Sequence, residues 1–100
     1  MFMQLDRLIH EKGRLAILAL LAASPQASYS EIRDNLGMTD GNVTSHLRTL
    51  HQAGYVAIIK SLEAGRPMTS YSLTRLGRSA FTDYLKALER ALLRAKQSLE

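Results

Sequence analysis

The spacing of apolar residues predicts a long helix at the start of the chain. From Leu5 onward, apolar side chains return at helical spacing, and residues 15–23 form an uninterrupted apolar run. This pattern is typical of a helix over 5–23 that neighbouring elements cover from more than one side. Ser24-Pro25 then ends the helix, because the residue before a proline disfavours the helical conformation.

Two shorter helices are predicted to follow directly. Ser28 and Glu31 have the spacing of a capping box, in which each side chain satisfies a backbone N–H group at a helix start. Thr39 is a suitable N-cap for a further helix. Because only residues 37–39 separate these helices, segment 28–53 is predicted to be a helix-turn-helix whose second helix is free to enter a groove.

From residue 55 the apolar spacing changes from a helical period to a period of two. Residues 55–62 are rich in β-branched and aromatic side chains, and the strand pattern returns over 69–74. The glycine and proline within 63–68 are typical of a hairpin tip. Segment 55–74 is therefore predicted to be a two-stranded wing.

A last helix is expected over 75–98, with Thr74 as its cap. No linker or internal repeat divides the chain, so residues 1–100 are interpreted as one domain. The predicted fold class is mainly α with a small β-hairpin, namely a winged helix-turn-helix with long N- and C-terminal helices.

The last predicted helix carries two apolar stripes. One has the 4-3-4-3-4 spacing of a coiled-coil seam, and its members are Phe81, Leu85, Leu88, Leu92, Ala95 and Leu99. The other is narrower and consists of Gly77, Ala80, Tyr84, Ala87 and Ala91. Packing on its own domain needs one stripe, so two stripes favour pairing of the terminal helices across a two-fold axis, with Leu5, Leu8 and Ile9 also at the dimer interface. The alternative is one wide intramolecular face, and the pattern leaves open which stripe would meet the partner.

The predicted third helix separates an apolar face from a polar one. Val43, Leu47 and Leu50 are expected in the core. The candidate DNA-binding residues of this helix are Thr39, Gly41, Asn42, Thr44, Ser45, His46, Arg48 and Thr49. Arginine can bridge the two acceptors of guanine, and asparagine can pair with adenine. His46 borders the apolar face, so a packed, hydrogen-bonded histidine is the first interpretation and a DNA contact the second. A glycine at 41 would let the backbone approach a phosphate.

Charge and wing chemistry favour the same kind of partner. The net charge is +4, and residues 40–78 hold five Lys and Arg against two Asp and Glu. An excess of positive charge in the middle of the chain suits a polyanion. In the wing, Lys60 and Arg66 are candidate phosphate or minor-groove contacts, with Pro67 stiffening the tip.

These residues also carry a family resemblance. Residues 39–50 (TDGNVTSHLRTL), followed by 53–56 (AGYV), resemble the compact MarR/ArsR-like winged-helix transcriptional regulators, and most of all a short stand-alone family with a TDGN…HL…L…GY pattern. His10 with 14–18 resembles the start of that family's first helix, and 73–78 resembles its passage from wing to last helix. The resemblance implies double-stranded DNA binding by a homodimer, with the third helix in the major groove and the wing alongside. It names no operator and no small-molecule effector.

The sequence argues against several other classes. There is no cysteine, and His46 and His51 are five residues apart, so neither a metal site nor a cofactor is expected. The scattered carboxylates form no catalytic pair, so we expect no enzyme. The first seven residues lack the pattern of a signal peptide, and the longest apolar run is too short for a membrane span, so a cytoplasmic location is expected.

We therefore expect a sequence-specific regulator, acting as a repressor, that binds a pseudo-palindromic site as a dimer. The main alternative is a winged helix that serves as a protein-interaction module, since a fold does not fix a function. RNA binding is a weaker alternative, because the sequence shows no aromatic platform for stacking single-stranded bases.

Overall fold

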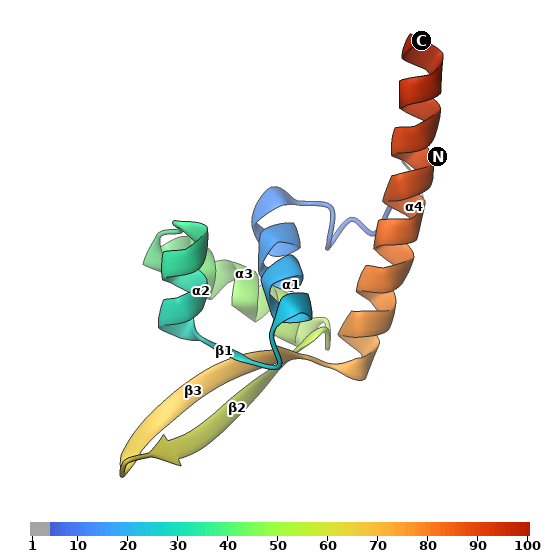
Figure 1. The fold of residues 1–100 in the computed structure, drawn as a ribbon. Coiled ribbons are helices and arrows are strands. Elements are labelled where there is room, and N and C mark those ends of the chain that lie inside the picture. Colours follow the sequence, from blue (N-terminus) through green and yellow to red (C-terminus); the bar gives the residue numbers. More distant parts are fainter. Residues whose placement is uncertain (1–4) are drawn as a thin grey trace.

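The computed structural model of the protein describes residues 5–100 and confirms the predicted fold class. Within these residues, four helices accompany a three-stranded antiparallel sheet of order β1-β3-β2. The elements are α1 (Lys12–Ala23), β1 (Ala27–Ser28), α2 (Tyr29–Leu36), α3 (Asp40–Gln52), β2 (Val56–Glu63), β3 (Arg66–Leu73) and α4 (Arg75–Leu99). In Figure 1, α1, α2 and α3 form the body, the β2–β3 hairpin extends from it on one side, and α4 projects from it on another.

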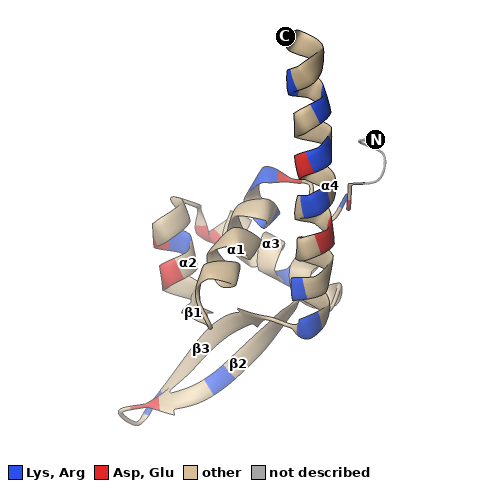
Figure 2. Cartoon of the chain, turned by 45° about the vertical axis from the view of Figure 1, so that its right-hand side comes forward, with Lys and Arg blue, Asp and Glu red and all other residues tan. Residues whose placement is uncertain are grey.

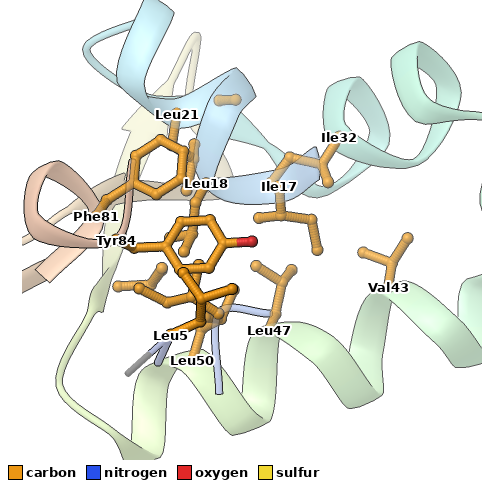
Figure 3. Close-up of a cluster of buried hydrophobic side chains, with 13 residues drawn as sticks. Leu5, Ile17, Leu18, Leu21, Ile32, Val43, Leu47, Leu50, Phe81 and Tyr84 are labelled. Atoms are coloured by element: carbon orange, nitrogen blue, oxygen red, sulfur yellow. The ribbon is translucent and has the colours of Figure 1, made fainter. Parts of the chain in front are cut away.

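One apolar core joins all the helices. The predicted buried face of α3 is confirmed, because Val43 and Leu50 are fully buried and Leu47 is 4% exposed. These side chains point toward those of α1 and of the base of α4 (Figure 3). The other members of the core are Leu5, Ile9, Ile17, Leu18, Leu21, Ala27, Ile32, Val56, Phe81 and Tyr84.

The first helix begins seven residues later than the predicted start at Leu5. Residues 5–11 form turns instead, and Glu11 caps α1 by accepting a hydrogen bond from the N–H of Arg14. Glu11 is the N-cap, and the hydrogen bond it accepts lowers the pKa of its carboxyl. Residues 5–11 are folded back by these turns, and Leu5 and Ile9 belong to the core.

Two side-chain hydrogen bonds fasten this N-terminal segment to the rest of the chain. The Tyr55 hydroxyl donates to Asp6 Oδ2 at 2.7 Å, and His10 Nδ1 lies 2.7 Å from the Tyr84 hydroxyl. The bond to Asp6, with partial burial and the carboxylate charge, raises the pKa of Tyr55 to about 12. Leu5, Leu8 and Ile9, predicted at a dimer interface, therefore pack within a single chain, with Leu5 4% and Ile9 0% exposed.

The hairpin is longer and tighter than predicted. Its tip is Ala64-Gly65, both with positive φ, so the two-residue turn has the twist that suits a hairpin. The sequence had suggested that Arg66 and Pro67 lie in the tip, but both residues belong to β3. Pro67 pairs with Leu62, one step beyond the closing pair of the turn, where an antiparallel ladder needs no N–H donor. The two-residue strand β1, which pairs with β3, was not predicted.

The three helix starts predicted from cap residues are confirmed. Ser28 and Glu31 form the reciprocal capping box of α2. Thr39 caps α3 by accepting from the N–H of Asn42, and Thr74 caps α4 by accepting from the N–H of Gly77. The Thr74 hydroxyl also donates to the carbonyl of Gly54 at 2.6 Å. This bond joins the start of α4 to the turn that follows α3.

The two stripes of α4 have different surroundings. The narrow stripe faces the chain's own core, where Gly77 and Tyr84 are buried and Ala80 and Ala87 are half-buried. Of the seam, Phe81 is 5% exposed and belongs to the core, and Leu88 packs against it. The remaining seam residues, Leu85, Leu92, Ala95 and Leu99, are exposed on the projecting part of the helix.

Gly77 is required by its surroundings, and this gives a stability prediction. A Cβ atom at position 77 would lie 2.0 Å from the Tyr55 carbonyl oxygen, whereas one at Gly41 would meet no atom within 4 Å. We expect Gly77→Ala to lower the free energy of unfolding by about 1–3 kcal/mol. Gly41→Ala should raise it by about 0.5–1 kcal/mol, because alanine favours a helix interior. Urea unfolding at equal protein concentration measures the free energy of unfolding of both variants. An equal change in the two variants would contradict the clash expected between a Cβ at position 77 and the Tyr55 carbonyl.

Candidate nucleic-acid interface

A set of polar contacts fixes α2 against the start of α3. The Tyr29 hydroxyl donates to the backbone oxygen of Asp40 at 2.9 Å and lies 3.1 Å from Thr44 Oγ1. The Arg33 guanidinium bonds Asp40 Oδ1 at 3.1 Å and Asp34 Oδ1 at 2.8 Å. These bonds lower the pKa of Asp34 and raise that of Arg33. The negative charge at the start of α3 is thus partly neutralised from α2.

The polar face of α3 lies at the surface. Five predicted residues are exposed there: Gly41, Asn42, Thr44, Ser45 and Arg48. Among the residues that the structure describes, Arg48 has no ion-pair partner. Its guanidinium is therefore available to an external acceptor. No contact within the chain explains Gly41, since a Cβ there would meet nothing within 4 Å.

The other three predicted α3 residues are partly used within the chain. The side-chain oxygen of Thr39 caps α3, and the half-buried Thr49 donates to the backbone oxygen of Ser45 at 3.1 Å. His46 turns away from the exposed face, because its ring packs on α1 where a Cβ at Gly13 would lie only 2.5 Å from Nε2. His46 Nδ1 is 3.8 Å from a Glu11 carboxylate oxygen and has no hydrogen-bond partner in residues 5–100. The packed position predicted first is found, but the expected hydrogen bond is not.

The pairing of β2 with β3 places the two basic wing residues on opposite faces. Lys60 shares a face with Ile58, and Ile58 lies opposite Tyr71 beside α3. Arg66 lies on the other face, directly across from Glu63. Both basic side chains are exposed. Figure 2 shows Lys and Arg on the wing and along α4, with acidic residues also at the wing tip, on α4 and on α2.

A cleft of about 240 Å³ separates α3 from the wing. Its lining residues are Tyr29, Thr44, Leu47, Arg48, His51, Ile58 and Tyr71. Burial, and to a lesser extent the neighbouring Tyr29, raises the pKa of Tyr71. Thr44 and Arg48 were predicted as DNA-binding residues from the sequence, whereas Tyr29, His51 and Tyr71 were not. The alternation in the two strands, which places Tyr71 opposite Ile58, was the one signal that could have found part of this cleft.

The described part of the chain offers no evident alternative chemistry. Residues 5–100 contain no cluster of three or more His, Cys, Asp or Glu side chains that could hold a metal ion. Over the same residues, no helix has the length and apolarity needed to cross a membrane. Residues 1–4, which belong to the segment inspected for a signal peptide, lie outside the described residues.

An exposed polar helix with a basic wing beside it defines a winged helix-turn-helix nucleic-acid-binding protein. Residues 14–92 match the family model described as a winged helix DNA-binding domain. The chain belongs to this family. The resemblance seen in the sequence is thereby confirmed, and DNA binding is what the description of the family states.

The chain is also similar to individual proteins and solved structures. An uncharacterized protein of Methanocaldococcus jannaschii is 38% identical over 72 residues, which are 72% of this chain and 78% of that protein. A transcriptional regulator homologue of Pyrococcus horikoshii has a similar structure, with a TM-score of 0.73, 33% identity and coverage of 87% of this chain and 89% of that one. The fold is also similar to that of PadR from Bacillus subtilis, solved in complex with operator DNA (TM-score 0.65, 21% identity, 75% of this chain and 47% of that one).

The contact between Arg33 and Asp40 predicts an indirect effect on DNA affinity. We expect Arg33→Ala to weaken DNA binding about two- to fivefold, because Asp40 would then repel a nearby phosphate. In an Asp40→Asn background the same change should have a smaller effect. Fluorescence anisotropy with one duplex measures all four proteins of this cycle. An equal loss in both backgrounds would instead indicate that Arg33 contacts DNA directly.

Proposed function

We propose that the protein is a sequence-specific transcriptional repressor that binds a pseudo-palindromic DNA site as a homodimer. The observation that carries this proposal is the exposed polar face of α3, where Asn42, Ser45 and Arg48 are accessible beside the wing. The apolar face of the same helix is fixed in the core, so the polar face can enter a major groove without rearrangement.

The side chains on α3 suit base edges as well as phosphates. Arg48 can donate two hydrogen bonds to guanine, and Asn42 can pair with adenine or hold a phosphate near the helix start. On the wing, Lys60 extends from the face beside α3, so it would reach the DNA strand next to the groove that α3 occupies. Arg66 and Pro67, near the end of the hairpin, would lie at its far edge. The operator complex of PadR, a protein of similar fold, supports a duplex as the ligand.

The exposed seam of α4 supports a dimer. Leu85 is 44%, Leu92 52% and Leu99 88% exposed, on a helix of 25 residues that projects from the body. The last turns of this helix are exposed all around in the described chain, and isolated helical turns are marginal in water. A second copy packed along Leu85, Leu92, Ala95 and Leu99 would cover these side chains and place two α3 helices on one face of the DNA.

Repression follows from occupancy. A dimer whose two α3 helices lie about 34 Å apart would cover two half-sites one DNA turn apart. A promoter site covered in this way is closed to other proteins.

Selection from a random duplex library at physiological salt tests the proposal. Enrichment of an inverted repeat with half-sites about one turn apart is the expected result. Binding without any enriched sequence would contradict sequence specificity. Binding to no duplex would favour the protein-interaction module.

On the selected site, Arg48→Ala should weaken binding by about 1–3 kcal/mol if Arg48 contacts a base pair through both of its donor nitrogens. The loss should largely disappear on duplexes changed at one base pair of each half-site. Arg90→Ala, which removes an equal charge from exposed α4, is the matched control and should have little effect. Anisotropy titrations measure these affinities. An equal loss on all duplexes would assign Arg48 to a phosphate.

The seam predicts the oligomeric state. Leu92→Glu should convert the dimer into a monomer, because a carboxylate would be buried in the apolar contact. Gln97→Glu adds the same charge to the opposite side of α4 and should leave the dimer intact. Sedimentation velocity distinguishes the two states. A wild-type protein that is monomeric at micromolar concentration would contradict the proposed dimer.

A further inference from the structure

The cleft between α3 and the wing has a polar side and an apolar side. Thr44, Arg48 and His51 line it from successive turns of α3, and Ile58 and Tyr71 line it from the hairpin. Leu47 forms part of its floor and is 4% exposed, whereas Ile58 is 41% exposed. The cleft is therefore an open site where polar side chains, among them the positively charged Arg48, meet a small apolar surface.

The position of His51 determines which of its nitrogens can donate. His51 Nδ1 lies 3.1 Å from the backbone oxygen of Val56. A carbonyl oxygen only accepts hydrogen bonds, so Nδ1 carries the hydrogen in this contact. A neutral ring then has a bare Nε2, which can accept but cannot donate. Only protonation of the ring makes Nε2 a donor while the bond to Val56 is kept.

The groups around His51 favour an anion. Tyr29 of α2, Arg48 of α3 and Tyr71 of β3 are the ionisable residues that line the cleft, and β2 contributes the apolar Ile58. No carboxylate is among the lining residues. Arg48 is one helical turn from His51 and has no ion-pair partner in residues 5–100. An anion would therefore meet donors and no carboxylate among the lining residues. The Asp40 carboxylate, whose Oδ1 lies 3.3 Å from the Tyr29 hydroxyl, is paired with Arg33.

We propose that this cleft binds a backbone phosphodiester of the duplex through the protonated ring of His51, while Arg48 one turn away keeps its donors for the base pair, so that DNA affinity increases as pH falls. The inference rests on the proposed function. With α3 in a major groove and the wing alongside, the DNA strand between them passes over the cleft. Leu47 and Ile58 would then contact the deoxyribose, and the phosphate would lie at Nε2 of His51.

Two variants separate the structural bond of His51 from the phosphate contact. Asparagine at 51 can keep a donor at the position of Nδ1 but has nothing at Nε2. Glutamine can place a neutral donor near the position of Nε2. Both lack the titrating ring, so we expect His51→Asn and His51→Gln to bind with little dependence on pH, and His51→Asn to bind more weakly than wild type at pH 6.

The experiment is an anisotropy titration of full-length protein with the selected duplex at pH 6 and pH 8, over a range of salt concentrations. We expect wild-type affinity to be higher at pH 6 by about tenfold for each protonated His51, or about a hundredfold for a dimer, because one charge-assisted hydrogen bond usually contributes about tenfold. The slope of log K against log salt should be steeper at pH 6 by about 0.9 for each protonated His51, or about 1.8 for a dimer. His10→Asn serves as control, because it removes a histidine of the N-terminal segment and should keep the wild-type pH dependence.

The outcomes separate this inference from the proposed function. If wild type binds the duplex with the same pH dependence and salt slopes as His51→Asn, the role of His51 is overturned and DNA binding stands. If wild type binds no duplex at either pH, the proposed function itself fails. Circular dichroism at both pH values verifies that each variant is folded, and a loss of pH dependence in His10→Asn would also contradict the assignment to His51.

Discussion

The packing of α3 on α1 is the constraint on which the rest of the structure depends. Val43, Leu47 and Leu50 enter the core beside Ile17 and Leu18, and this burial fixes the rotation of α3 about its axis. Once the rotation is fixed, the polar residues of α3 lie on the face opposite this contact, where Asn42, Ser45 and Arg48 are exposed. The side chains proposed to read DNA are therefore presented by the packing of α3 alone.

Polar contacts then refine this arrangement. Tyr29 and Arg33 of α2 hold the first turn of α3, and the same tyrosine forms one end of the cleft beside the wing. The contacts join residues of two different helices, and one of them is made to a backbone oxygen that any residue supplies. Helical spacing within α2 or α3 therefore did not mark the Tyr29 side of the cleft, although Thr44 and Arg48 were predicted from the polar face of α3.

In the N-terminal segment and α4, too, local sequence predicted only part of the structure. Helical spacing predicted one helix from Leu5. Instead residues 5–11 form turns, in which Asp6 accepts a hydrogen bond from Tyr55, and Glu11 caps a helix that begins at Lys12. Residues 5–11 fill the space between α1 and the base of α4 and so use apolar side chains that had been assigned to a partner. The exposed leucines farther along α4 are the part of the predicted interface on which the proposed dimer rests.

The sequence by itself determined the order and type of the main elements, the caps at Ser28, Thr39 and Thr74, and the polar face of α3. These features depend on periodicity and on hydrogen bonds within a few residues, which local sequence encodes. Only the tertiary structure decided the start of α1, the opposite wing faces of Lys60 and Arg66, and which stripe of α4 is buried. Each of these depends on contacts between distant segments, where packing against a particular neighbour overrides the local pattern.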